Sequence, residues 1–195
     1  MRFMSEIEAQ NGRILPGVSR RGFLATLGAV VGALALAPMS TLASTERRGE
    51  RVLSFVHSHT GERLSLPTWG DGSYLTGNLS RVESFLRDFR TGERHAIDPA
   101  LLDQLHLLQM ATGSTAPFQV ISGYRSPQTN AALRASGGGQ ASRSLHMQGR
   151  AIDVRLADVR SSVLRDAALE LGLGGVGFYP TQDFVHVDTG PVRHW

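Results

Sequence analysis

The segment from which this chain is best interpreted reads Ser144-Leu145-His146-Met147-Gln148-Gly149-Arg150-Ala151-Ile152-Asp153-Val154. His146 ends a glycine-rich loop, and Gly149 permits a sharp turn into a β-strand. Asp153 stands in an otherwise apolar strand, where an ionised carboxylate needs a partner because burying it unpaired is unfavourable. A loop histidine and a strand carboxylate on one sheet edge can meet at a metal ion. Alternatively, Asp153 is a buried ion-pair partner of Arg125 or Arg155.

A second histidine lies in a strand near the end of the sequence, within Asp183-Phe184-Val185-His186-Val187-Asp188. With His146 and Asp153 it would complete a three-ligand zinc site that leaves a fourth position for water. These ligand types also suit other divalent metals, so they favour zinc without requiring it. Taken alone, His186 would more often be a structural residue than a ligand.

Three further residues could supply chemistry or support the ligands beside such a metal. Asp183 precedes His186 by three residues and could act as general base and then general acid, although it could also be a simple turn residue. Arg125, in Ser122-Gly123-Tyr124-Arg125-Ser126, could polarise a substrate carbonyl or stabilise an oxyanion. Asp188 lies on the same strand face as His186 and could be its outer partner or an alternative base.

Hydrophobic spacing and turn residues predict a mixture of strands and helices. Strands are expected at Val52–His57, Arg63–Leu66, Gln119–Ser122, Ala151–Leu156, Gly175–Tyr179 and Phe184–Asp188. Helices are expected at Leu79–Phe89, Pro99–Thr112, Pro127–Ala135 and Ser161–Leu171. Residues 67–77 and 137–144 are expected to be loops. These elements predict one α+β domain in which helices flank a small antiparallel sheet.

The first residues are typical of an export signal rather than of a folded domain. Ser19-Arg20-Arg21-Gly22-Phe23-Leu24 is a twin-arginine signature, and a short Ala-rich apolar stretch follows it. Small residues at Thr41-Leu42-Ala43 place cleavage after Ala43. We therefore predict a twin-arginine signal peptide at 1–43, a domain at 44–195 and no stable membrane span after cleavage. The alternative is an uncleaved membrane anchor.

Composition excludes some function classes. Residues 1–43 carry four of the 20 basic and two of the 17 acidic residues, so residues 44–195 have a formal charge of only +1. Such a balance gives no support to nucleic-acid binding. The chain has no cysteine, so any metal site must use histidine and carboxylate ligands, and the domain must be stabilised by its core. The sequence says nothing of oligomeric state.

Three motifs together carry a resemblance to a known family. They are Ser-Gly-Tyr-Arg-Ser at 122–126, Ser-x-His-x-x-Gly-x-Ala-x-Asp at 144–153 and Asp-x-x-His at 183–186. This set resembles the D-alanyl-D-alanine carboxypeptidase and murein endopeptidase family of zinc peptidases, which shares the hedgehog/D,D-peptidase-like fold. The similarity spans roughly Val52 to Trp195 and is strongest to the YcbK-like branch of exported bacterial proteins.

The resemblance implies a role for each matching residue. His146, Asp153 and His186 match the family's ligands for a single zinc ion. Asp183 falls at the catalytic acidic position, and Arg125 matches the arginine that steadies the substrate carbonyl. Ser144 and Tyr124 match positions at the substrate, the serine being one that holds a terminal carboxylate in dipeptidase members. Between the acid and the histidine, where many members carry tryptophan, this chain has Phe184-Val185.

The resemblance therefore implies an exported zinc peptidase of the periplasm or cell envelope that hydrolyses peptidoglycan peptides with a metal-activated water. Endopeptidase and carboxypeptidase activities both fit, and loop 135–143 is expected to decide between them. One alternative is a non-catalytic zinc domain that binds murein or a protein. Another is a structural domain whose three residues bind no metal.

Overall fold

The computed structural model describes residues 49–195. The predicted signal peptide at 1–43, its cleavage site and the domain boundary after Ala43 lie outside the described residues and stay predictions. Within 49–195 no helix is both long and apolar enough to cross a membrane.

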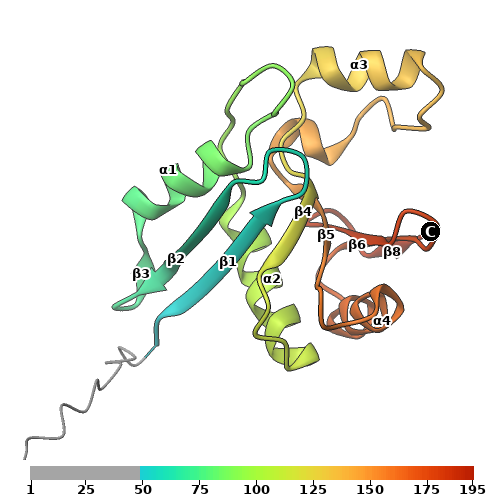
Figure 1. The fold of residues 1–195 in the computed structure, drawn as a ribbon. Coiled ribbons are helices and arrows are strands. Elements are labelled where there is room, and N and C mark those ends of the chain that lie inside the picture. Colours follow the sequence, from blue (N-terminus) through green and yellow to red (C-terminus); the bar gives the residue numbers. More distant parts are fainter. Residues whose placement is uncertain (1–48) are drawn as a thin grey trace, which may run out of the picture. The chain divides into compact units, whose positions relative to one another are not determined.

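The domain is built on one eight-stranded sheet with the strand order β3-β2-β1-β4-β5-β7-β6-β8 (Figure 1). The strands are β1 (Arg51–His57), β2 (Arg63–Gly70), β3 (Ser73–Tyr74), β4 (Phe118–Ser122), β5 (Ala151–Arg155), β6 (Gly175–Tyr179), β7 (Phe184–Asp188) and β8 (Arg193–His194). The α+β class is confirmed. The sheet is larger than expected and mixed, because β1 pairs with β4 and β6 pairs with β8 in parallel.

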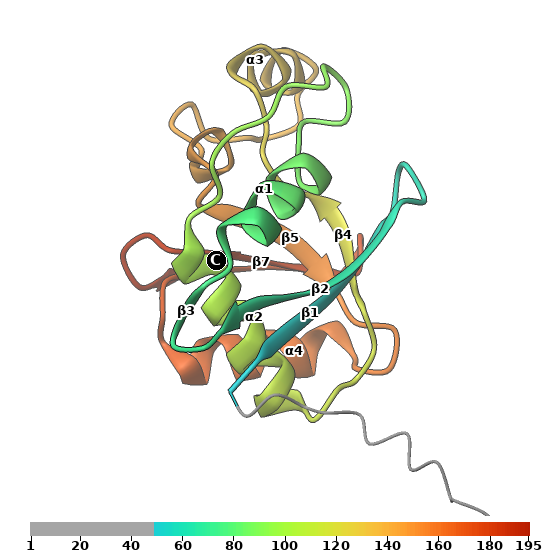
Figure 2. The ribbon, with the colours of Figure 1, turned by 90° about the vertical axis from the view of Figure 1, so that its left-hand side faces the viewer.

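Four α-helices and one short 3₁₀ helix accompany the sheet. They are α1 (Thr76–Phe85), α2 (Pro99–Thr112), α3 (Pro127–Ala135), α4 (Ser161–Leu171) and η1 (Leu145–Gln148). Helices α2 and α4 contact each other and pack on the sheet, α2 against β1 and α4 against β6 and β7 (Figure 2). Helix α3 lies at the other end of the domain (Figures 1 and 2).

The hairpin of β1 and β2 is longer than the sequence predicts. Strand β2 continues through Pro67 to Gly70, and β3 follows, where a loop was expected. Pro67 is accommodated because the β1–β2 register shifts at this point, between Arg51 and Val52. A proline has no N–H to donate and is tolerated at such an irregularity.

Strands β5 and β7 separate the core from the polar site. Ile152 and Val154 on β5 and Val185 and Val187 on β7 are fully buried in the hydrophobic core. Because side chains alternate across a sheet, the residues between them project to the opposite face. Asp153 and His186 are direct partners in the β5–β7 register, so this alternation places both of them on that face.

Candidate metal centre

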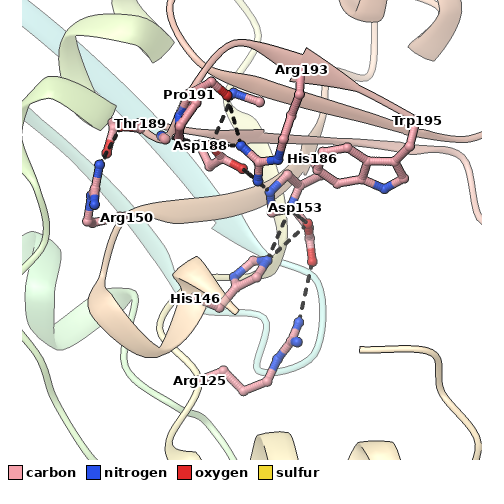
Figure 3. Close-up of polar contacts among 12 residues, drawn as sticks. Arg125, His146, Arg150, Asp153, His186, Asp188, Thr189, Pro191, Arg193 and Trp195 are labelled. Carbon is pink, nitrogen blue, oxygen red and sulfur yellow. Dashed lines mark hydrogen bonds and ion pairs between the residues drawn. The ribbon is translucent and has the colours of Figure 1, made fainter. Parts of the chain in front are cut away.

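Three ligand-type side chains converge on the sheet face opposite the core. His186 Nδ1 lies 2.8 Å from Asp153 Oδ1, and His146 Nε2 lies 3.2 Å from His186 Nδ1 and 3.3 Å from Asp153 Oδ1 (Figure 3). All three residues are buried. Among the described residues, these three form the group whose ligand atoms lie within 4.8 Å of one another. The structure therefore brings together the three residues that the sequence singles out.

The outer nitrogen of each histidine is bound to an acceptor, which fixes the ring's tautomer. His146 Nδ1 donates to the Gly123 carbonyl oxygen at 2.7 Å, and His186 Nε2 donates to Asp188 Oδ2 at 2.9 Å. With those nitrogens protonated, His146 Nε2 and His186 Nδ1 are the nitrogens that face Asp153, and a metal ion would bind there in place of a proton on His186 Nδ1. This is the outer-shell arrangement that orients histidine ligands in metal sites.

The electrostatics of the cluster favour a cation at its centre. Burial by itself would lower the pKa of His186, but hydrogen bonds to Asp153 and Asp188 outweigh it and raise the pKa to about 9. Burial likewise opposes ionisation of Asp153, yet the charge and hydrogen bonds of His146 and His186 hold the pKa of that carboxyl below its usual range. Two imidazole nitrogens and one carboxylate oxygen are a donor set that suits Zn²⁺, so the residues fit a zinc ion.

Asp188 is the outer residue with the most contacts. It is fully buried, and it accepts hydrogen bonds from the Gly175 and Gly190 N–H groups and from the Arg193 guanidinium as well as from His186. These donors outweigh the effect of burial and lower the pKa of Asp188 below its usual range. The lowered pKa makes this carboxylate a weak base, and both of its oxygens already accept hydrogen bonds. Asp188 therefore orients His186 and is poorly suited to act as the general base.

Asp188→Asn should weaken zinc binding about 10- to 100-fold, as loss of an outer-shell partner does. The amide turns an NH₂ group toward donors that need an acceptor, which shifts the ring of His186. Competition with a chromophoric zinc chelator would measure the affinity, with Asp166→Asn, an exposed residue of α4, as the control. Unchanged affinity in Asp188→Asn would contradict the role given to Asp188.

Two glycines give the backbone the shape that positions His146. Gly149 ends η1 with a left-handed backbone (φ 64°), and a Cβ there would lie 2.0 Å from the Ala96 carbonyl oxygen. A Cβ on Gly123 would lie 2.6 Å from the Leu86 carbonyl oxygen. Only glycine permits both close approaches, and the Gly123 carbonyl is the group that orients His146.

Arg125 lies on the other side of Asp153. Its Nη2 is 3.7 Å from Asp153 Oδ2, and the side chain is buried (Figure 3). Its hydrogen bonds to Asn130 and Ser122 are long, at 3.4 and 3.3 Å, and its Nε has no partner among the described residues. A guanidinium whose Nη groups are only weakly hydrogen-bonded, beside a metal centre, is suited to bind a developing negative charge.

The centre lies at the base of a hollow of about 480 Å³ between the C-terminal strands and loop 138–144. Arg125 and Ser144 line this hollow together with the three converging residues. Ser144 precedes η1, and its hydroxyl makes no capping bond there. Its position agrees with contact to a substrate in the hollow.

Two sequence-predicted site residues lie elsewhere. Tyr124 is buried, donates its hydroxyl to Glu93 Oε1 at 2.7 Å and stacks on His95, and it does not line the hollow. Asp183 has a left-handed backbone (φ 55°) and a 62% exposed side chain that faces Arg155 at 3.7 Å. It lines a separate, open hollow with Arg155. The structure thus leaves both residues outside the group formed around Asp153.

Sequence reasoning left the role of Asp188 open and did not identify Arg193 and Trp195, which also line the hollow. The signal available for Asp188 is its spacing, since it stands two residues after His186 in a strand and shares its face. The contribution of β8 has no comparable signal, because it depends on a parallel pairing with β6.

The chain is similar to a peptidase family described as peptidoglycan L,D-endopeptidase MepK, whose profile matches residues 45–195. It is 41% identical to the peptidoglycan L,D-endopeptidase MepK of Escherichia coli K12 over 177 residues, which cover 91% of this chain and 97% of that protein. It is 40% identical to the probable peptidoglycan L,D-endopeptidase MepK of Haemophilus influenzae, over 87% of this chain and 92% of the relative.

A solved structure, the L-Ala D-Glu endopeptidase ChiX of Serratia marcescens, is 25% identical in sequence. The match covers 47% of this chain and 79% of that one, with a TM-score of 0.35, which is too low to establish a shared arrangement of elements.

Proposed function

The chain belongs to the peptidase family described as peptidoglycan L,D-endopeptidase MepK, and on this premise we propose that it hydrolyses a peptide bond of peptidoglycan with one zinc ion. The observation that carries the proposal is the convergence of His146 Nε2, Asp153 Oδ1 and His186 Nδ1, with both outer histidine nitrogens bound to acceptors. The names of the relatives favour an endopeptidase over a carboxypeptidase.

His146, Asp153 and His186 would hold the zinc. When bound, zinc supplies a Lewis acid that polarises a carbonyl and lowers the pKa of a coordinated water toward neutrality. Three protein ligands are the usual number in catalytic zinc sites, because one position must stay open for chemistry. The opening of the hollow toward solvent supports access of a peptide to that position.

Arg125 would hold the oxygen of the scissile carbonyl as it becomes negative. Its guanidinium already lies beside Asp153, Asn130 and Ser122 in a buried position, so it needs little rearrangement during the reaction. Such preorganised donors stabilise a transition state more than they stabilise a bound substrate. Ser144, whose hydroxyl makes no capping bond to η1, lines the same hollow and would contact a carboxylate of the stem peptide.

Asp183 would carry the proton from the attacking water to the leaving amine. This role rests on its family position three residues before His186, and it requires the exposed ion pair with Arg155 to open. Opening it is easy, because exposed ion pairs contribute at most about 1 kcal/mol. Asp188 is less suited to the task, because both of its oxygens already accept hydrogen bonds from His186, Arg193 and the backbone.

Asp183→Asn should lower kcat at least about 100-fold, the usual contribution of a general base, and leave zinc bound. Asp158→Asn, which removes another carboxylate from the same open hollow, should leave both unchanged. Initial rates and metal analysis of the purified variants measure this. Loss of zinc in Asp183→Asn would mean that its role is structural.

A peptidoglycan substrate implies action in the cell envelope. The twin-arginine signature at residues 19–24 is the proposed route of export. Replacing Arg20 and Arg21 with lysine should retain the protein in the cytoplasm, and fractionation of cells would show this. Export of that variant at normal levels would argue against the twin-arginine route.

Digestion of defined cross-linked muropeptides, followed by mass spectrometry, tests the proposed function. The zinc-loaded protein should convert a cross-linked species into two products whose summed mass exceeds the substrate by one water. A chelator should stop the reaction and added zinc should restore it. If zinc binds at one ion per chain and no product forms, the domain is a non-catalytic zinc protein that binds murein or a partner.

A further inference from the structure

An aromatic wall stands beside the metal centre, formed by Tyr179, Phe184 and Trp195 from three different strands or their ends. The rings of Tyr179 and Phe184 stack with centroids 4.4 Å apart. Trp195 donates its indole N–H to the Tyr179 hydroxyl at 2.9 Å, and its ring lies 5.2 Å from that of His186. All three line the hollow that contains the metal centre.

The backbone fixes the position of Trp195. Its N–H donates to the Val176 carbonyl and its carbonyl oxygen accepts from the Phe178 N–H, which extends the parallel pairing of β8 with β6. Between these two residues lies Gly177, the register partner of His186. A Cβ on Gly177 would lie 2.6–2.8 Å from the indole ring. Because Gly177 has no side chain, the indole ring of Trp195 can lie over β6 and reach His186.

Arg193 ties the same ring to the outer shell of the metal centre. Its Nη2 lies 2.7 Å from Asp188 Oδ2, and its guanidinium carbon lies 5.1 Å from the centre of the Trp195 ring (Figure 3). The indole is thus held by backbone pairing, by a hydrogen bond and by a cation–π contact. An anchored ring needs little ordering when a ligand arrives, so contact with it favours binding.

Although these contacts hold Trp195 in place, 51% of its surface is exposed to solvent. We propose that Trp195 is a substrate-contacting residue whose exposed indole face packs on an uncharged aliphatic part of the stem peptide beside the scissile bond. This inference rests on the proposed function. Aliphatic atoms are the matching chemistry, because an indole face contributes mainly apolar contact and Arg193, the charged group beside the ring, is already paired with Asp188.

Kinetics on a purified cross-linked muropeptide test the proposal. Trp195→Ala should raise KM about tenfold with kcat nearly unchanged, and Trp195→Phe, which keeps an aromatic face, should recover most of the loss. Trp69→Phe on β2 is the matched control and should leave KM unchanged. An unchanged KM in Trp195→Ala, or a fall confined to kcat, would overturn the proposal.

Fluorescence supplies a second readout, since Trp69 and Trp195 are the only two tryptophans in the chain. In zinc-loaded Trp69→Phe protein, titration with a purified disaccharide–tetrapeptide should shift the emission of Trp195 saturably. In Trp195→Phe protein the same titration should leave the emission of Trp69 constant. A Trp195 emission that does not respond would refute the contact even if Trp195→Ala proved too unstable to assay.

The two proposals can fail separately. If the unsubstituted protein hydrolyses no muropeptide, the peptidase proposal fails, and the titration still reports whether Trp195 touches the peptide. If the protein hydrolyses muropeptides while Trp195→Ala retains its zinc and its KM, only the proposal for Trp195 fails.

Discussion

Replacing Asp153 with asparagine should give a protein that folds but no longer retains zinc, with peptidase activity at least about a thousandfold lower. Asp153 contributes the anionic oxygen of the ligand set and lies within 3.3 Å of a nitrogen of each histidine. Asparagine has nearly the same shape but no charge and binds zinc poorly. A bound metal contributes several kcal/mol to transition-state stabilisation, so its loss corresponds to a factor of this size.

Asp103→Asn is the control for this change, because Asp103 is paired with Arg51 on a part of the domain away from the hollow. It should keep one zinc per chain and full activity. Zinc content by atomic emission, activity on muropeptides and a thermal melt should be measured on both variants. An Asp153→Asn protein that keeps one tightly bound zinc would contradict the ligand assignment.

Replacing Arg125 with glutamine should lower kcat about 100- to 1,000-fold while KM and zinc content change little. This is the effect of removing one preorganised donor to a developing oxyanion. The expectation follows from the place of Arg125 in the lining of the hollow and from the long hydrogen bonds of its Nη1 and Nη2, which leave these donors for the substrate. Arg125→Lys should recover only part of the rate, because an ammonium lacks the planar fork.

Arg134→Gln, in the last turn of α3, is the matched control for the loss of a guanidinium. It should leave kcat unchanged. Metal analysis is essential for Arg125→Gln, since the substitution also removes the ion pair to Asp153. A normal kcat would contradict the role of Arg125, and a protein without zinc would show that Arg125 acts through the ligand instead.

Local signals predicted much of the fold. Asp98 caps α2 by accepting from the Ala100 N–H with Pro99 in the first turn, and Ser126 caps α3 in the same way. Both starts can be identified in the sequence because capping depends on a few consecutive residues. The parallel pairs β1–β4 and β6–β8 could not be predicted, since parallel strands are not joined by a local turn and their pairing depends on tertiary packing.

The convergence of His146, Asp153 and His186 was predicted from a motif set, and the structure adds the reason for it. The β5–β7 register makes Asp153 and His186 direct neighbours, and Gly149 turns the chain so that His146 reaches them. Sequence spacing cannot establish a register, which is why the residues alone left a structural histidine as an alternative.

Residues whose contacts depend on orientation were harder to predict. Tyr124 and Asp183 each adjoin a residue of the site by one to three positions, but their side chains leave toward Glu93 and Arg155. Trp195 reaches the hollow only because Gly177 leaves space over β6. Such placements depend on the direction of each side chain and on small residues in neighbouring strands that leave space for it. The order of residues in the sequence does not show either.

Titration of zinc into metal-free protein, with muropeptide hydrolysis measured at each step, tests the account most directly. Activity should be absent before zinc is added, rise in proportion to the zinc and reach a plateau at one ion per chain. Full activity in protein shown to be free of metal, or no activity at one bound zinc per chain, would contradict a zinc peptidase built on His146, Asp153 and His186.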